Sequence, residues 1–227
     1  MILPRRPHGV VFDMDGLLFD TEVIVRDAMT SAAARLGFSV PEGLFLSLIG
    51  LGSDTCRTRL LDHYGNEFDL DGFWAAVDLD FNRALEGRTF LKTGVVELLD
   101  WLDEAGVPRA IATSSQHTHV DRNLAIHGLT GRFDAIVAHG DYPLGKPAPD
   151  PFLKAASELG LKPEHCLALE DSLNGVRAAS AAGMMTIMVP DLIGPSDESR
   201  AACLGVANDL HEVRALLEAA RRSYLVP

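Results

Sequence analysis

The feature that most constrains the fold is a short apolar run, Gly9 to Phe12 (GVVF), that ends abruptly at Asp13. A buried parallel strand that stops at a loop has this pattern. Further apolar runs follow along the chain, each after a helix-like segment. The runs are Arg109–Ala112, Ala135–Ala138, Cys166–Leu169 and Met185–Val189, and the helix-like segments include 95–104, 120–127, 151–159 and 173–182. This alternation predicts a doubly wound, Rossmann-like α/β fold with a parallel sheet, which binds ligands at the carboxyl ends of its strands.

A helical insert is predicted directly after the first strand. Between Asp20 and Arg88 no run has the pattern of a strand, and glycines separate three segments with helical periodicity. These segments are Val23–Leu36, Asp54–Tyr64 and Phe73–Leu85. We expect a helical cap at residues 20–88 and an α/β catalytic core formed by residues 1–19 and 89–227. A cap attached there would lie over the strand ends, where it can close on a substrate and exclude water.

Length and charge agree with this organisation and narrow the range of partners. The 227 residues suit one core with a sizeable insertion rather than two full domains. With 20 basic and 32 acidic side chains the formal net charge is -12, so extended nucleic acid and anionic membrane surfaces are unfavourable partners. A small phosphorylated metabolite is also an anion, and an acidic chain that binds one needs local cations such as a metal ion and a lysine.

The cysteines and the hydropathy of the chain predict a protein of the cytoplasm. Cys56, Cys166 and Cys203 are odd in number and lack the short paired spacing of a zinc site or a disulfide framework. No apolar run of signal-peptide length precedes Asp13, and the longest apolar stretch, near 178–189, is too short to cross a bilayer. The sequence sets no oligomeric state, and we expect a monomer or a weak oligomer.

Two aspartates follow the first strand. Asp13 and Asp15 are two residues apart in nearly extended chain, so both carboxylates can face the same way, and Gly16 permits a tight turn after them. Such a pair suits a divalent metal and a mechanism with one nucleophile and one acid or base. The same spacing recurs twice between residues 69 and 80, after no apolar strand, and we assign those pairs to the solvated surface.

Polar side chains also follow the later strands. Thr113 and Ser114 could cradle a phosphate before a helix, Lys146 places a cation between stiffening prolines, and Glu170 with Asp171 forms a second acidic pair. Each has an ordinary structural explanation when taken alone: a helix cap, a rigid loop, and acidic residues that favour a helix N-terminus. One shared site explains all of these strand ends together better than a separate structural reason for each.

The same segments resemble the haloacid dehalogenase superfamily, in its branch of capped phosphatases and β-phosphoglucomutases. The segment FDMDGLLFDTE, at Phe12–Glu22, is similar to the first motif of the family, and Thr113 is similar to the second. Lys146 in GKPAPD resembles the third motif, and LEDS, at Leu169–Ser172, resembles the fourth. The resemblance covers essentially the whole chain, and the helical insert resembles the cap of the family.

The resemblance implies a role for each of these residues. Asp13 would attack phosphorus to form an aspartyl phosphate, and Asp15 would protonate the leaving oxygen and then activate water. Thr113 and Ser114 would bind the phosphoryl oxygens, and Lys146 would neutralise charge on them while contacting Asp13. Resembling dehalogenases lack the second aspartate and need no magnesium, so its presence implies phosphate chemistry rather than dehalogenation.

The resemblance also implies a Mg²⁺ cofactor. Its ligands would be Asp13, the backbone carbonyl of Asp15 and Asp171, with Glu170 bound directly or through water. The ion would offset the repulsion between the phosphate and the surrounding carboxylates.

The cap positions favour a phosphatase over a phosphomutase. Mutases of this branch carry a histidine and an arginine where this chain has Val25 and, in our alignment of the glycine loop, Ser53. We therefore expect hydrolysis of a small phosphomonoester, such as a sugar or polyol phosphate, with a β-phosphoglucomutase-like activity as the alternative. A phosphate-accepting signalling module without turnover is a remote alternative, because such a module needs neither the cap nor Asp15. Val25, Ser53 and His117 are candidates to line the substrate pocket.

Overall fold

A parallel sheet of six strands forms the centre of the molecule, in the order β3-β2-β1-β4-β5-β6. The computed structural model describes residues 1–85 and 90–223. The strands are β1 (Gly9–Phe12), β2 (Arg109–Ala112), β3 (Ala135–Val137), β4 (Cys166–Glu170), β5 (Met185–Met188) and β6 (Gly205–Val206). All neighbouring strands run parallel, which confirms the predicted doubly wound fold. The sequence gives no signal for β6, because two residues are too few to carry a pattern.

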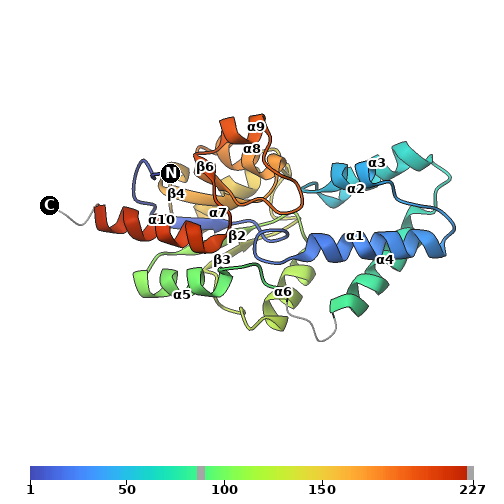
Figure 1. Cartoon of the computed structure of the whole chain (residues 1–227), viewed down its shortest axis with the longest axis horizontal. Helices are drawn as coiled ribbons and strands as arrows, with labels where there is room; N and C mark the ends of the chain where they lie inside the picture. Colours follow the sequence, from blue (N-terminus) through green and yellow to red (C-terminus); the bar gives the residue numbers. More distant parts are fainter. Residues whose placement is uncertain (86–89, 224–227) are drawn as a thin grey trace.

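Helices cover both faces of this sheet (Figure 1). The core helices are α5 (Val95–Ala105), α6 (His117–Ile126), α7 (Asp150–Glu158), α8 (Leu173–Ala181), α9 (Asp197–Ala202) and α10 (Leu210–Ser223), with a 3₁₀ helix at Pro163–His165. Successive side chains of β1 point to opposite faces. Val10 and Phe12 pack in the cluster that contains α5, α6 and α10, whereas Val11 packs in the cluster that contains α7 and α8. The apolar character of β1 therefore follows from burial on both sides.

The insert after β1 is helical, as the sequence predicts, and has a hydrophobic core of its own. It contains α1 (Thr21–Arg35), α2 (Glu42–Leu48), α3 (Ser53–Tyr64) and α4 (Leu70–Leu85). Met29, Leu60, Phe73 and other apolar side chains form a cluster separate from those of the sheet. The sequence analysis missed α2, which is only 7 residues long. The predicted cap boundary between residues 88 and 89 lies outside the described residues.

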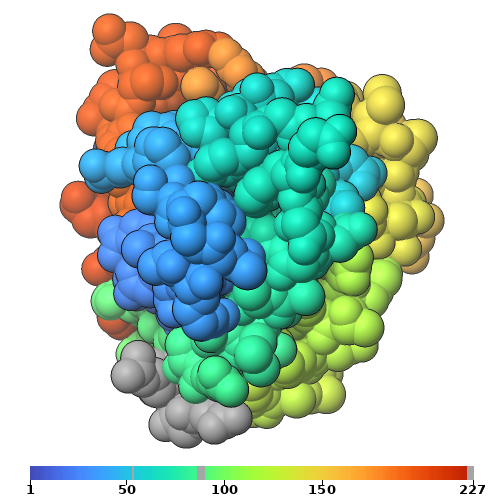
Figure 2. All heavy atoms as spheres, turned by 90° about the vertical axis from the view of Figure 1, so that its right-hand side faces the viewer, coloured from blue at the N-terminus to red at the C-terminus, as the bar shows by residue number. Residues whose placement is uncertain are grey.

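The cap helices lie at the end of the molecule opposite the chain termini, with α1 and α4 packed against each other (Figure 1). Viewed from that end, the cap covers the centre of the face, and core segments are visible around its edge (Figure 2). None of the helices within residues 1–85 and 90–223 combines the length and apolar character needed to cross a bilayer.

Candidate active site

The order of the strands sets the position of the site. β1 lies between β2 and β4 in the sheet. After β1 the chain adds β2 and β3 toward one edge, and it then crosses back to add β4, β5 and β6 toward the other edge. Ligands bind at such switch points, beyond the carboxyl ends of the strands. Asp13 follows β1, Thr113 follows β2, and Glu170 ends β4. Together with Lys146 from the loop before α7, Asp13 and Thr113 border a cavity of about 410 Å³ between core and cap.

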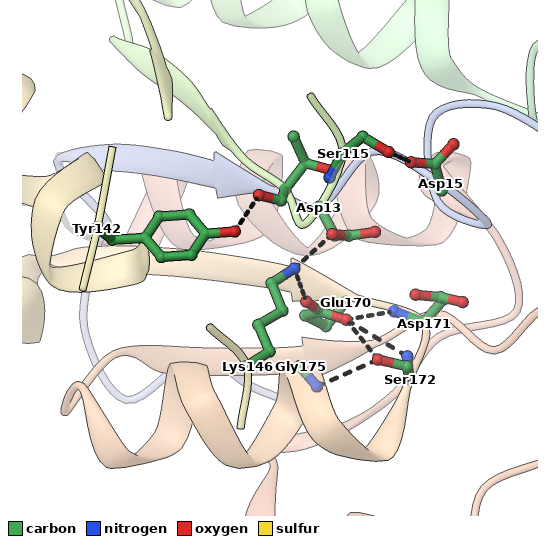
Figure 3. A network of polar contacts seen from close by, with 10 residues as sticks. Asp13, Asp15, Ser115, Tyr142, Lys146, Glu170, Asp171, Ser172 and Gly175 are labelled. Atoms are coloured by element: carbon green, nitrogen blue, oxygen red, sulfur yellow. Dashed lines mark hydrogen bonds and ion pairs between the residues drawn. The ribbon is translucent and has the colours of Figure 1, made fainter. Parts of the chain in front are cut away.

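Lys146 joins two buried carboxylates at the base of this site (Figure 3). Its Nζ contacts Oδ1 of Asp13 and lies 2.5 Å from Oε1 of Glu170. All three side chains are buried. Removing charged groups from water is costly unless they are paired, and this arrangement satisfies the ammonium with two opposite charges.

The pKa values reflect both burial and this pairing. Burial raises the pKa of Asp13 to about 8, with Lys146 acting against the shift and Glu170 adding to it. Burial, followed by the nearby charges of Asp13 and Glu170, also raises the pKa of Asp171 well above its usual value. Burial alone would lower the pKa of Lys146, but the two carboxylates it contacts hold that pKa above its usual value. One cation therefore faces an excess of buried carboxylates.

This excess of negative charge fits a divalent cation. Carboxylate oxygens of Asp13, Glu170 and Asp171 all lie within 4.8 Å of one another. Glu170 is already engaged, because its Oε2 accepts hydrogen bonds from the N–H of Asp171 (3.2 Å) and from the N–H (3.3 Å) and hydroxyl (3.2 Å) of Ser172. Oxygen ligands of this kind suit Mg²⁺, which keeps several waters and takes one or two protein carboxylates. Asp13 and Asp171 are the carboxylates best placed to bind it.

Asp15 is held separately from this cluster. Its Oδ1 accepts a hydrogen bond of 2.6 Å from Thr21 Oγ1, and its Oδ2 accepts one of 2.7 Å from Ser115 Oγ. The turn that follows requires Gly16, whose φ is +83° and at which a Cβ would collide with the Asp171 carboxylate. The sequence predicts no contact of Thr21 or Ser115 with Asp15, although Thr21 lies within the first motif and Ser115 directly follows the predicted phosphate-binding residues Thr113 and Ser114.

The Thr113 loop is fixed by hydrogen bonds at its start. The N–H of Thr113 donates to the carbonyl of Val137 at 3.0 Å, and its own carbonyl accepts from the Tyr142 hydroxyl at 2.9 Å. The N–H of Ser115 donates to Thr113 Oγ1 at 3.1 Å. Thr113 and Ser114 both line the cavity, as a phosphate-binding role requires.

The three proposed pocket residues have different positions. Val25 of α1 lines the cavity. Ser53 is the first residue of α3, and its side chain lies outside the described part of the structure. His117 is half exposed and is absent from the cavity lining; its Nε2 lies 2.9 Å from Oδ2 of Asp141. His119, two residues further along α6, lines the cavity instead, because residues i and i+2 of a helix point to different faces.

Glu22 is a further acidic residue at the cavity that the sequence analysis did not propose. Its Oε2 is buried and has no hydrogen-bond partner among the described residues. Burial, followed by the nearby charges of Asp191, Asp13 and Asp15, raises the pKa of Glu22 to about 8. The position of Glu22 in the first turn of α1 could have been read from the sequence, but the approach of Asp191 could not.

The fold and the site together define a capped α/β enzyme whose buried carboxylates and lysine suit an anionic substrate. The chain belongs to the haloacid dehalogenase-like hydrolase family, whose model matches residues 7–183. The resemblance of its motifs to that superfamily is thereby confirmed.

Relatives of known description agree with this assignment. The chain is 35% identical over 198 residues to a probable pseudouridine-5'-phosphatase of Drosophila melanogaster, covering 82% of this chain and 83% of the relative. It is 31% identical over 206 residues to hexitol phosphatase B of Escherichia coli K12, covering 84% and 86%. Among solved structures, CbbY from Rhodobacter sphaeroides in complex with phosphate superposes with a TM-score of 0.80 at 28% identity, covering 91% of this chain and 96% of CbbY.

Proposed function

We propose that this chain is a magnesium-dependent phosphatase that hydrolyses a small phosphomonoester through an aspartyl phosphate on Asp13. The observation that carries the proposal is the contact of Asp13 with Lys146 at the base of a capped cavity, with Asp15 held nearby. A nucleophile, a neutralising cation and an acid or base are the groups that this chemistry needs.

In the first half-reaction, the Asp13 carboxylate attacks phosphorus and the bond between phosphorus and the ester oxygen breaks. Asp15 gives a proton to that oxygen, so the alcohol leaves neutral. Lys146 neutralises charge on the phosphoryl group, and the hydroxyls of Thr113 and Ser114 bind its oxygens. In the second half-reaction, Asp15 takes a proton from water, the water oxygen attacks phosphorus, and inorganic phosphate leaves Asp13.

Asp13, Asp171 and the backbone carbonyl of Asp15 would hold Mg²⁺, and Glu170 would orient Asp171 through its backbone and fix Lys146. When bound, the ion supplies positive charge that allows a phosphate dianion to approach these carboxylates. The hydrogen bonds from Thr21 and Ser115 keep the Asp15 side chain clear of the metal ligands and available for proton transfer.

The cap supports hydrolysis rather than phosphomutase activity. A mutase needs a second phosphate site, whose cations form charge-assisted hydrogen bonds. Within the described residues, Arg57 is the only cation that the cap contributes to the cavity lining, and its Nη2 lies 2.5 Å from Asp71. Val25 adds an apolar side chain where resembling mutases have a histidine. We therefore favour water as the acceptor of the phosphoryl group.

The names of two relatives support a phosphorylated sugar or polyol as the substrate. One is named for a hexitol and another for a nucleoside phosphate, so they share a phosphorylated sugar-like alcohol and differ in whether it bears a ring base. We propose a sugar or polyol phosphate as the substrate class.

Phosphate release from a panel of sugar, polyol, nucleotide and carboxylate phosphomonoesters tests this function. We expect release with Mg²⁺, none with a chelator, and none from Asp13→Asn. The exposed Asp27→Asn change on α1 is a matched control and should leave the rate unchanged. Release by Asp13→Asn within about tenfold of the wild-type rate would exclude Asp13 as the nucleophile.

A further inference from the structure

The cap contributes a largely apolar wall to the cavity. Its side chains come from α1, from the loop between α2 and α3, and from α4. The apolar side chains that these segments add to the cavity lining include Val25, Ile49, Leu51, Trp74, Val77 and Phe81. Most of them are only partly buried, although they pack against the hydrophobic core of the cap. They therefore keep apolar surface available to a bound molecule.

Three polar side chains that the cap adds to this cavity have partners. The hydroxyl of Thr21 donates to Asp15, and the guanidinium of Arg57 pairs with Asp71. Cys56 Sγ lies 3.6 Å and 3.8 Å from two backbone carbonyl oxygens. The Thr21 hydroxyl and the Cys56 thiol are thereby engaged, and Arg57 is the one of the three with N–H donors left for a substrate hydroxyl.

Few unpaired polar groups remain on the cap side of the cavity. Trp74 Nε1 and Glu22 Oε2 are buried without a hydrogen-bond partner in the described part of the chain. Asp78 is exposed, and no partner of its carboxylate is seen there. An open polyol has a hydroxyl on each carbon, so the hydroxyls that face the cap wall would lose water against largely apolar side chains.

A flat ring matches this wall better than a polyol does. Burying apolar area is favourable, and the indole of Trp74 and the phenyl ring of Phe81 can pack against a planar π-system. The unpaired Nε1 of Trp74 can donate to one acceptor atom on such a ring. A cavity of about 410 Å³ lies within the range of small-molecule sites, roughly 300 to 1,000 Å³.

We propose that the preferred substrate is a phosphate ester whose alcohol carries a flat, largely apolar ring, which packs against this wall while the phosphate lies at Asp13. The inference rests on the proposed phosphatase function and specifies its leaving group. Two kinds of phosphate ester have such a ring on the alcohol. One is a sugar phosphate that bears an unsaturated ring, and the other is the phosphate of a simple aromatic alcohol.

Two matched pairs of primary phosphate esters test the inference, one pair for each of these two kinds of ester. Uridine 5'-monophosphate is compared with ribose 5-phosphate, and benzyl phosphate with glycerol 1-phosphate, all with Mg²⁺. In each pair the ester bond is of the same type, so kcat/KM reports recognition of the ring. We expect the ring-bearing ester to exceed its partner by at least about tenfold in one or both pairs. Hydrolysis with no ring preference in either pair overturns the inference and leaves the phosphatase function standing.

Binding of the same four esters to Asp13→Asn measures the ring preference without turnover. If the wild-type enzyme hydrolyses none of them but the variant binds the ring-bearing esters more tightly, the cavity recognises the ring as inferred, and it is the phosphatase function that fails. Equal binding within both pairs overturns the inference.

Replacing the indole tests the wall itself. Trp74→Leu keeps an apolar side chain but removes the aromatic face and the N–H donor. We expect the kcat/KM ratio between ring-bearing and ring-free esters to fall by about threefold to tenfold. Leu79→Ala, at an exposed position on the same helix and away from the cavity lining, is the control and should leave the ratio unchanged. An unchanged ratio in a folded Trp74→Leu enzyme would contradict the role of Trp74.

Discussion

Thr21, the first residue of cap helix α1, donates a hydrogen bond of 2.6 Å from its Oγ1 to Oδ1 of Asp15 in the core. Ser115 donates to the other oxygen of the same carboxylate at 2.7 Å. The carboxylate that we propose as acid and base is therefore held from two sides, one of them in the cap. Its orientation should depend on where the cap sits.

Thr21→Val should lower kcat about tenfold, because it removes a hydrogen bond to a charged group while keeping the shape of the side chain. The KM for the substrate should change little, since the phosphate is bound by other residues. Thr30→Val on the same helix removes a hydroxyl that bonds only to the Arg26 carbonyl, so it should retain wild-type turnover. Thr21→Ser should restore most of the rate, and full activity of Thr21→Val would show that Asp15 needs no support from the cap.

Lys146→Met should reduce the free energy of unfolding by about 3 to 5 kcal/mol, because it leaves the carboxylates of Asp13 and Glu170 buried without their cation. The loss should be smaller at pH 5 than at pH 8, because burial raises the pKa of Asp13 to about 8, and a protonated Asp13 needs the cation less. Denaturant unfolding in the presence of a chelator measures both values. Lys154→Met, which breaks an exposed pair with Glu158 on α7, should leave the free energy of unfolding close to the wild-type value. Equal losses for the two variants would refute the buried-pair argument.

The parts of this site that the sequence predicts are those that a strand end positions. Asp13, Thr113 and Asp171 each follow an apolar strand, and a parallel sheet brings such positions to one edge whatever the details of packing. The hydrogen bonds of Thr21 and Ser115 to Asp15 became visible only in the structure. The first depends on how the cap meets the core, and the second on how the loop after β2 lies against the loop after β1.

In the rest of the fold, too, the sequence predicts what a local pattern determines and misses what depends on packing. The long helices and buried strands have clear periodicity, whereas α2 and β6 are too short to show one. His119 lines the cavity and His117 does not. Which of the two faces the cavity depends on how α6 is rotated about its own axis, and spacing along the chain does not determine that rotation.

Gly50→Ala should hinder the seating of the cap on the core. Gly50 lies in the cap loop with φ at +72°, and a Cβ there would come within 2.7 Å of Ser172 Oγ, next to the proposed metal ligand Asp171. We expect kcat/KM to fall by more than about tenfold, while the free energy of unfolding falls by only about 1 to 2 kcal/mol from the strained backbone. Gly52→Ala in the same loop meets no atom within 4 Å and should stay near wild type in kcat/KM. If both variants have the same activity, the contact between loop and core does not matter for catalysis.

Glu22→Gln should change how stability depends on pH. The pKa of Glu22 is raised from 4.5 to about 8 in the folded protein, so the folded state holds this proton more tightly than the unfolded chain does. The stabilisation from the protonated acid is fully present below about pH 4.5 and is lost as the pH rises through about 8. Glutamine is neutral throughout and keeps the shape of the protonated acid. The variant should therefore lie within about 1 kcal/mol of the wild type near pH 5 and exceed its free energy of unfolding by about 4 kcal/mol at pH 8.

Denaturant unfolding from pH 5 to pH 9 with a chelator present checks this difference. Asp13 and Asp171 also have raised pKa values, so both proteins should lose stability as the pH rises, and the variant should lose less. Glu42→Gln, at an exposed position in the first turn of α2, should follow the wild-type curve. Parallel curves for Glu22→Gln and the wild type would mean that Glu22 is ionised in the folded state at neutral pH. In that case the Glu22 carboxylate would be stabilised in the cavity by solvent or cations, and it would face a substrate as a hydrogen-bond acceptor only.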